Sequence, residues 1–308
     1  IVENVEKVIV GKREAIELAL IALICDGHVL IEDVPGVGKT GLVSSIAKSI
    51  DASFKRIQFT PDVLPSDITG FSIFNQKTGE FEYRPGAIMS QIILADEINR
   101  TSPKTQASLL EVMEENQVTV DGVTYKVPRP FMVLATQNPV EYLGTFPLPE
   151  AQIDRFLMKI SIGYPLPSEE SLILSRFQYE NPLDSLSPVA GSNDILSIQS
   201  KVREVYVHKS LNNYIVDIIG KTRNHPDVLL GSSTRGSLAL FRAAQAWALY
   251  NNRNYVIPDD IKKMTIPVLS HRIILKQEAK LKKITQEDVL LGILDKTTVP
   301  VVDYNDKK

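Results

Sequence analysis

Short apolar runs alternate with amphipathic stretches in the first half of the chain. Runs of Ile, Leu and Val with little alternation are typical of strands that are buried on both faces of a parallel sheet. The strands predicted in this way are 28–32 (HVLIE), 55–59 (KRIQF), 92–96 (IILAD), 131–136 (FMVLAT) and 157–162 (LMKISI). Because helical patterns separate them, we expect an α/β domain with right-handed crossover connections.

Two insertions interrupt this alternation of strands and helices. Residues 68–89 contain two strand-like pieces around a turn at 75–79, and residues 116–127 contain two more around Asp121-Gly122. An Asp-Gly pair between alternating apolar residues is a strong signal for a tight hairpin turn. Each insertion is therefore predicted to form a β-hairpin.

The pattern becomes helical after about Pro167. A turn-rich connector at 181–194 precedes amphipathic stretches that predict helices at 195–207, 211–222, 235–251, 259–270 and 286–296. Thr234 and Pro258 stand where a helix N-cap and a first-turn proline are expected. The sequence thus predicts an α/β domain over residues 1–167 and a small all-helical domain over residues 168–308.

Composition narrows the classes of protein to consider. Apolar residues make up 44% of the 308 residues, which is enough for a buried core. The longest apolar run, near residues 15–25, is interrupted by Glu17 and is too short for a membrane span. The single cysteine, Cys25, lies in that run, so we expect a buried thiol and a cytoplasmic, reducing location. A net charge of −3 gives no support to a nucleic-acid-binding protein, although a local basic face is still compatible with it.

Residues 32–41 (EDVPGVGKTG) match the phosphate-binding loop G-x-x-x-x-G-K-[ST] at every position except the first, where Asp33 replaces glycine. The loop follows a predicted strand and opens a predicted helix, as a phosphate loop requires. Lys39 is expected to reach the β- and γ-phosphates of ATP, and the Thr40 hydroxyl to ligate Mg²⁺. Asp33 is expected to be tolerated at the loop entry if its φ is negative, and to hydrogen-bond its own backbone. The residues expected to contact the nucleotide are Pro35, Gly36, Val37, Gly38, Lys39, Thr40 and Gly41. The alternative interpretation is a simple turn with a surface lysine.

Polar side chains follow two of the other predicted strands. Asp96 and Glu97 end the strand IILAD, and Asn138 follows the strand FMVLAT. Ligands bind at the carboxyl ends of the strands in open α/β sheets. Asp96 is expected to hold Mg²⁺ through water, Glu97 to deprotonate the water that attacks the γ-phosphate, and Asn138 to position that water. The alternative for Asp96 and Glu97 is an acidic first turn of a helix, and the alternative for Asn138 is a turn asparagine before Pro139.

The order of these motifs resembles that of the AAA+ ATPases, and the residues within them resemble those of the MoxR family. The stretches that carry the resemblance are EDVPGVGKT, ADEINRTSPKTQASLLEVMEE, ATQNPVEYLGTFPLPEAQIDRF and VIPDDIKKMTIPVLSHRI. It extends over nearly the whole chain and implies a P-loop α/β/α domain with two hairpin insertions, followed by a small helical lid. MoxR proteins also lack the first loop glycine, so the resemblance implies that Asp33 belongs to a working site.

The resemblance also implies roles for residues that the pattern alone leaves open. Arg155 matches the arginine finger, which reaches the γ-phosphate held by a neighbouring subunit. Arg235 matches the sensor 2 arginine of the lid, and Val10 and Gly11 match the segment that packs on the adenine. From the residues alone, Arg155 is a surface arginine on a polar turn and Arg235 an exposed first-turn arginine.

We therefore expect a Mg²⁺-dependent ATPase that forms a homo-oligomeric ring, expected to be hexameric. MoxR relatives imply a chaperone-like role on client protein complexes, with a partner that carries a von Willebrand factor A domain. The alternative is a nucleic-acid motor or regulator built on the same module. It is disfavoured because neither hairpin is strongly basic. A third interpretation, a module that holds ATP without hydrolysing it, conflicts with the presence of both Asp96 and Glu97.

Overall fold

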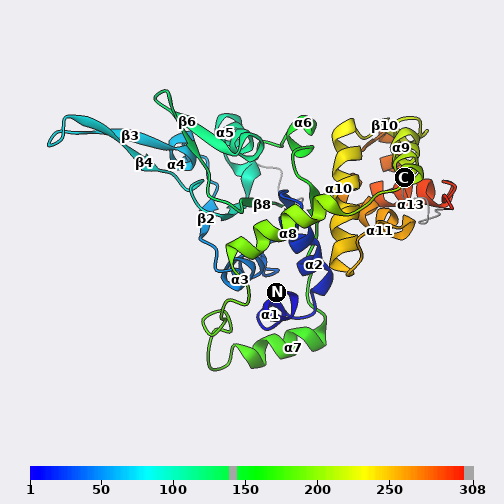
Figure 1. Ribbon diagram of the computed structural model, residues 1–308, viewed down its shortest axis with the longest axis horizontal. Coiled ribbons are helices and arrows are strands. Elements are labelled where there is room, and N and C mark those ends of the chain that lie inside the picture. Colours follow the sequence, from blue (N-terminus) through cyan, green and yellow to red (C-terminus); the bar gives the residue numbers. More distant parts are fainter. Residues whose placement is uncertain (139–143, 302–308) are drawn as a thin grey trace. The chain divides into compact units, whose positions relative to one another are not determined.

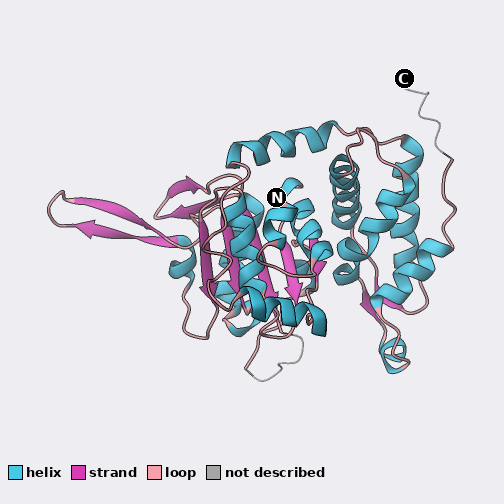
Figure 2. Ribbon diagram, turned by 90° about the horizontal axis from the view of Figure 1, so that it is seen from below, coloured by secondary structure: helices cyan, strands magenta, loops and turns pink. Residues whose placement is uncertain are grey.

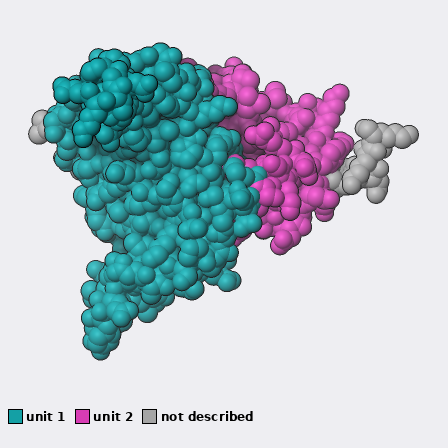
Figure 3. All heavy atoms as spheres, turned by 60° about the vertical axis from the view of Figure 1, so that its left-hand side comes forward, with its two compact units in different colours: residues 1–155, 160–196 teal, residues 156–159, 197–308 magenta. Residues whose placement is uncertain are grey.

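The computed structural model describes residues 1–138 and 144–301, which fall into two compact units (Figure 3). Unit 1 consists of Ile1–Arg155 and Ile160–Leu196. Unit 2 consists of Phe156–Lys159 and the chain from Ser197 onward. The chain therefore crosses between the units three times.

The centre of unit 1 is a sheet with the strand order β2-β5-β8-β1-β9, although Met158 and Lys159 of the edge strand β9 are grouped with unit 2. The strands are β1 (Val29–Glu32), β2 (Phe54–Gln58), β5 (Ile92–Asp96), β8 (Met132–Gln137) and β9 (Met158–Ile160). The pairs β2–β5, β5–β8 and β8–β1 are all parallel. Every residue of β5 is buried, as its unbroken apolar run predicts. The α/β architecture expected from the sequence is confirmed, with the fifth strand shorter than expected.

The helices of unit 1 follow or precede these strands, and several of them pack on one another (Figures 1 and 2). They are α1 (Val2–Glu6), α2 (Arg13–Ile24), α3 (Lys39–Ser49), α4 (Pro65–Thr69), the 3₁₀ helix η1 (Ile98–Arg100), α5 (Pro103–Glu115), α6 (Glu150–Ile153) and α7 (Pro167–Arg176). Helix α3 packs on β5, and α1 packs against α2 and α3. Since α3 begins at Lys39, the expected strand–loop–helix unit is present around the phosphate loop.

Both predicted hairpins are present and belong to unit 1. Strands β3 (Gly70–Asn75) and β4 (Glu80–Pro85) form a long antiparallel pair that projects away from the sheet (Figures 1 and 2). Strands β6 (Gln117–Val120) and β7 (Val123–Lys126) form a shorter pair. The rings of Tyr83 and Tyr125 stack with their centroids 4.0 Å apart, so the base of the first hairpin packs on the second.

Unit 2 is mainly helical. Its elements are the C-terminal part of α8 (Ser192–Glu204), α9 (Lys209–Arg223), β10 (Val228–Leu230), α10 (Thr234–Tyr250), α11 (Pro258–Leu269), the 3₁₀ helix η2 (Ser270–Arg272), β11 (Ile274–Leu275), α12 (Gln277–Leu281) and α13 (Gln286–Asp295). Helix α10 packs against α9 and α11. The pair β10–β11 was not predicted, because each strand is too short to show a sequence period. The N-cap of α10 is Ser233 rather than Thr234, whereas Pro258 does begin α11.

The boundary between the units differs from the one predicted at residue 167. Helix α7 and the connector after it belong to unit 1, because their polar groups bind its N-terminal segment. Arg176 donates to the carbonyl oxygens of Glu6 and Lys7 at 2.8 and 2.7 Å. The Asn4 amide donates to the Ser187 carbonyl at 2.9 Å. Among the helices of 1–138 and 144–301, none combines the length and apolar character that a membrane span needs.

The start of α11 depends on a buried ion pair. The Asp260 carboxylate accepts two hydrogen bonds from the Arg253 guanidinium, at 2.5 and 2.7 Å, and one from the backbone N–H of Ile257 at 2.8 Å. Only 2% of the Asp260 side chain is exposed. We expect Asp260→Ala to lower the free energy of unfolding of unit 2 by about 3 kcal/mol, because it removes the buried counter-charge of Arg253. Urea unfolding followed by the fluorescence of Trp247, the single tryptophan, measures this in α10.

The matched control is the neighbouring Asp259→Ala. The Asp259 side chain is 78% exposed and pairs with Lys262 at 3.3 Å, so its loss should cost less than about 1 kcal/mol. Equal destabilisation by the two substitutions would contradict the assignment of the buried pair.

Candidate nucleotide site

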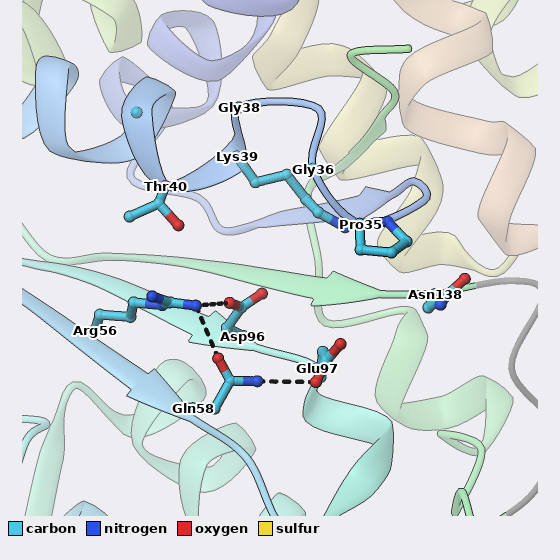
Figure 4. Close-up of a pocket in the computed structure, with 11 residues that line it drawn as sticks. Pro35, Gly36, Gly38, Lys39, Thr40, Arg56, Gln58, Asp96, Glu97 and Asn138 are labelled. Atoms are coloured by element: carbon cyan, nitrogen blue, oxygen red, sulfur yellow. Dashed lines mark hydrogen bonds and ion pairs between the residues drawn. The ribbon is translucent and has the colours of Figure 1, made fainter. Parts of the chain in front are cut away.

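A pocket in unit 1 brings together the predicted phosphate loop and the polar ends of the strands (Figure 4). It is lined by Pro35, Gly36, Gly38, Lys39, Thr40, Gly41, Arg56, Gln58, Asp96, Glu97 and Asn138. The strands β1, β5 and β8 are parallel neighbours, so the residues that follow their carboxyl ends meet at one edge. All of these lining residues were predicted to belong to the site except Arg56 and Gln58.

The phosphate loop uses two glycines in the left-handed region. Gly36 has φ +86° and Gly38 has φ +88°, and apart from its chain neighbours no described residue comes within 4 Å of the position that a Cβ would take at either. Backbone conformation, rather than crowding within the chain, therefore requires glycine here. Gly38 is the N-cap of α3 and offers no side chain to its first N–H groups. These donors, at the positive end of the helix, form a ready site for an anion such as a phosphate.

Lys39 lies between the loop entry and the strand-end carboxylates. Its ammonium donates a hydrogen bond to the carbonyl oxygen of Asp33 at 2.8 Å. Burial lowers the pKa of Lys39 below its ordinary value, and the nearby charges of Asp96, Asp33 and Glu97 oppose this shift. A partly desolvated ammonium is suited to bind a phosphate group, which would replace the lost hydration.

Asp33 is the residue that departs from the loop pattern. Its side chain is buried and accepts hydrogen bonds from Ser161 Oγ at 3.0 Å, from the backbone N–H of Ile162 at 2.5 Å and from that of Gly163 at 3.2 Å. Its φ is negative, as expected, but the expected bond to its own backbone is replaced by these contacts with the chain after β9. Asp33 thus ties the entry of the phosphate loop to a segment about 130 residues away.

Asp96 is held on both sides at the end of β5. Thr136 Oγ1 donates to Asp96 Oδ1 at 2.6 Å, and Arg56 Nη2 donates to Asp96 Oδ2 at 2.6 Å. The Thr136 side chain is fully buried in β8, whereas the Arg56 side chain is 46% exposed. The buried contact orients the carboxylate, and the exposed contact places the Arg56 guanidinium beside the outer carboxylate oxygen.

Glu97 adopts a conformation that is uncommon for a residue with a side chain. Its φ is +58° and its ψ is +49°, in the left-handed region. The Glu97 N–H donates to Thr136 Oγ1 at 2.8 Å, which helps to hold this turn. Its carboxylate accepts a hydrogen bond from the Gln58 amide at 2.8 Å (Figure 4). It also pairs with Arg100 at 3.2 Å. The strained backbone and these partners together fix where the carboxylate points.

Arg56 and Gln58 were missed by the sequence analysis. They lie two residues apart on β2, so both side chains point to the same face, and Arg56 Nη2 also donates to Gln58 Oε1 at 2.8 Å (Figure 4). The signal was the alternation of polar Arg56 and Gln58 with buried Ile57. This alternation showed a polar face, but only the order of the strands shows that β2 lies next to β5.

The other predicted site residues do not line this pocket. Val37 is buried within the loop, and Val10 is buried in the segment before α2. Gly11 has φ +70°, and a Cβ there would collide with the Glu169 carboxylate. Ile9 Cδ1 lies 3.2 Å from the position of a Cβ on Gly41, so the segment 9–11 does lie next to the phosphate loop.

The two predicted arginines lie elsewhere in the chain. Arg155 follows α6 and is held against α5, where its Nη1 donates to the Leu110 carbonyl at 3.0 Å and pairs with Glu114. Arg235 lies in the first turn of α10 in unit 2, with an exposed side chain. Their assignment as arginine finger and sensor 2 stays a prediction.

Comparison with known proteins gives consistent results for both units. A model of the ATPase family associated with various cellular activities (AAA) matches residues 28–158, and an AAA lid domain model matches residues 220–292. The uncharacterized protein YeaC of Bacillus subtilis (strain 168) is 57% identical over 97% of this chain and 94% of its own length. Chaperone MoxR1 of Mycobacterium tuberculosis is 41% identical over 97% of this chain and 81% of its own. A crystal structure from Cytophaga hutchinsonii, solved as that of a candidate ATPase, is 43% identical, has a TM-score of 0.91 and covers 97% of this chain and 93% of its own.

The contacts of Asp33 predict that restoring the missing loop glycine is harmful. Asp33→Gly completes the consensus phosphate loop but removes the acceptor of three hydrogen bonds, at a cost of about 1–3 kcal/mol for each buried donor left unpaired. We expect it to weaken binding of a fluorescent ATP analogue by roughly tenfold or more, because the loop is no longer preorganised. Asp33→Asn keeps one acceptor oxygen and should have an intermediate effect. If Asp33→Gly binds the analogue equally well or more tightly, the hydrogen bonds of Asp33 to residues 161–163 do not preorganise the loop.

Proposed function

The chain belongs to the MoxR family of AAA+ ATPases, and we propose that it is a Mg²⁺-dependent ATPase that works as a ring on client protein complexes. The observation that carries the proposal is the convergence of the phosphate loop, Asp96 and Glu97 in one pocket of unit 1. In this proposal, the N-terminus of α3 and Lys39 bind the phosphates, and the Glu97 carboxylate binds the attacking water.

Thr40 and Asp96 are the residues that would hold Mg²⁺ in this pocket. They offer a hydroxyl and a carboxylate, and hard divalent cations prefer such oxygen ligands. The guanidinium of Arg56 already lies on Asp96 Oδ2, which supports the fit of a cation beside that oxygen. When bound, the ion would neutralise charge between the β- and γ-phosphates. Lys39 would bind the same phosphates from the loop side.

Glu97 is the proposed general base. Its carboxylate is fixed by Gln58 and Arg100, and its backbone by Thr136. A base must be within hydrogen-bond reach of the water that it deprotonates, and its orientation therefore decides the rate. Asn138, which also lines the pocket, is proposed to position the same water (Figure 4).

Arg155 and Arg235 are proposed to act on the γ-phosphate together with these residues. In a ring, expected to be hexameric, Arg155 of one subunit would complete the site of the next, as an arginine finger does. Arg235 would sense phosphate loss from the lid, and Val10 and Gly11 would pack on the adenine. The strong similarity to a protein named Chaperone MoxR1 supports a chaperone-like role. A von Willebrand factor A domain partner and a cytoplasmic location stay predictions.

The β3–β4 hairpin is the proposed contact with the client. It exposes the large side chains of Phe71, Ile73, Phe74 and Phe81, while the charges of Lys77 and Arg84 are balanced by those of Glu80 and Glu82. A tracking surface for nucleic acid needs a positive groove along the phosphate backbone, and this hairpin has no net positive charge. Exposed aromatic and aliphatic side chains are better suited to apolar segments of a protein.

The proposal predicts that turnover of ATP depends on assembly. Turnover per chain should rise with protein concentration in the wild type, since a neighbour completes each site. We expect Glu97→Gln and Arg155→Ala each to lower turnover at least about a thousandfold, with ATP binding by Glu97→Gln retained. Turnover and molecular mass are measured in the same buffers across the concentration range.

Turnover that is independent of concentration and unchanged by Arg155→Ala would mean that the site is complete within one chain. The matched control for Arg155→Ala is Arg100→Ala, which removes an arginine that lies beside Glu97 in the same chain. Its effect should not depend on protein concentration.

A further inference from the structure

We infer that Arg272 is a positioning residue that links the start of α10, where Arg235 lies, to the backbone directly after Arg155. The inference rests on the proposed role of Arg155 in a neighbouring site. It identifies a mechanical connection within one chain between the two arginines that are proposed to act on the γ-phosphate. Four sets of contacts carry it.

The guanidinium of Arg272 forms hydrogen bonds with the backbone directly after Arg155. Its Nη2 donates to the Phe156 carbonyl at 2.6 Å, and its Nη1 donates to the Leu157 carbonyl at 3.0 Å and to the Val268 carbonyl. Arg272 is 7% exposed, and Phe156 is fully buried. A buried guanidinium is costly unless hydrogen bonds satisfy it, so these carbonyls hold the side chain in one position.

The His271 imidazole lies beside the same Phe156 carbonyl and beside Arg272. Its Nε2 lies 3.0 Å from the Phe156 carbonyl and 2.8 Å from Arg272 Nη1. Burial, the charge of Arg272 and the charge of Lys159 hold the pKa of His271 well below its ordinary value, although the Phe156 carbonyl opposes this. The imidazole is therefore neutral near pH 7, and Arg272 is the charged member of the pair.

The stem of Arg272 packs against the start of α10. A Cβ added to Gly236 would lie 3.1 Å from Arg272 Cδ, 2.1 Å from Ser232 Oγ and 3.4 Å from Leu269 Cδ2. Gly236 directly follows Arg235 in the first turn of the helix. A displacement of this turn must therefore also displace Arg272, because close-packed atoms transmit small shifts.

The side chain of Arg155 is bound within unit 1, whereas Arg272 belongs to unit 2. The Arg155 side chain binds Leu110 and Glu114 of α5 in unit 1, whereas the next residue, Phe156, belongs to unit 2. Successive Cα atoms are about 3.8 Å apart, so Arg155 cannot stay in place if Phe156 is displaced. Arg272 is thus placed to convert a change at Arg235 into a change in how Arg155 is presented.

Mixed assemblies test this link. Glu97→Gln subunits have a dead site but an intact Arg155, so they can complete the site of a neighbour whose own Arg155 is misplaced. Arg272→Lys keeps the positive charge but cannot donate to the Phe156 and Leu157 carbonyl oxygens from two nitrogens at once. We expect it to lower turnover at saturating ATP roughly 10- to 100-fold, as a small misplacement of a catalytic group does. Mixed one to one with Glu97→Gln, it should recover turnover well above the mean of the two separate proteins.

Two further mixtures make the outcome specific. Arg155→Ala mixed with Glu97→Gln should also recover turnover, and a failure there would overturn both the shared site and this inference. The matched control is Arg253→Lys, which weakens another partly buried, ion-paired arginine of unit 2 without touching residues 156 and 157. Any turnover that it loses should not be recovered by mixing.

The inference is overturned if Arg155→Ala is rescued while Arg272→Lys is not, or if Arg272→Lys alone keeps full turnover. Trp247 fluorescence and the mass of the assembly show whether each variant folds and assembles. If Arg272→Lys does not fold, Gly236→Ala replaces it, because the added methyl group pushes on Ser232 and on the Arg272 stem. The same loss and the same rescue are then expected.

Discussion

Parallel pairing of β1, β5 and β8 is the constraint on which the nucleotide site depends. In parallel strands all carboxyl ends lie at one edge, so residues that are far apart in the chain meet there. The phosphate loop follows β1, Asp96 and Glu97 end β5, and Asn138 follows β8. Because β8 lies between β1 and β5, its Thr136 reaches both the Asp96 carboxylate and the Glu97 backbone. One buried hydroxyl thus orients two neighbouring site residues.

Asp33, which replaces the first glycine of the phosphate-loop motif, has a structural role of its own. A buried carboxylate is costly unless hydrogen-bond donors satisfy it, and Asp33 finds them in Ser161, Ile162 and Gly163. A glycine at this position would give the loop more freedom but no tie to the chain after β9. The Asp33 carbonyl also receives the Lys39 ammonium, so the same residue orders both the loop and its lysine.

In our inference, Arg272 links the two arginines that are proposed to act on the γ-phosphate, Arg155 and Arg235. Arg155 binds α5 in unit 1, and the residue after it is held by Arg272 of unit 2. The stem of Arg272 lies against Gly236, next to Arg235. In a ring, this arrangement would let phosphate sensing by the lid of one subunit adjust the arginine that serves its neighbour. Such coupling needs no long pathway, since it passes through one side chain and one peptide unit.

Local patterns along the chain predict the buried strands, the hairpin turns, the helical second half and the phosphate loop around Lys39. These features follow from the residue period, from turn chemistry and from fixed spacing within a motif, all of which are readable along the chain. Asp96, Glu97 and Asn138 were also predictable, because strand ends converge in a parallel sheet. Other features come from the packing of distant segments: the partners of Asp33, the place of Arg56 and Gln58 beside Asp96, the inclusion of α7 in unit 1, and the hydrogen bonds of Arg272 to residues 156 and 157. Each of these joins segments that are distant in sequence, and no local period or turn signal specifies which distant segments will pack together.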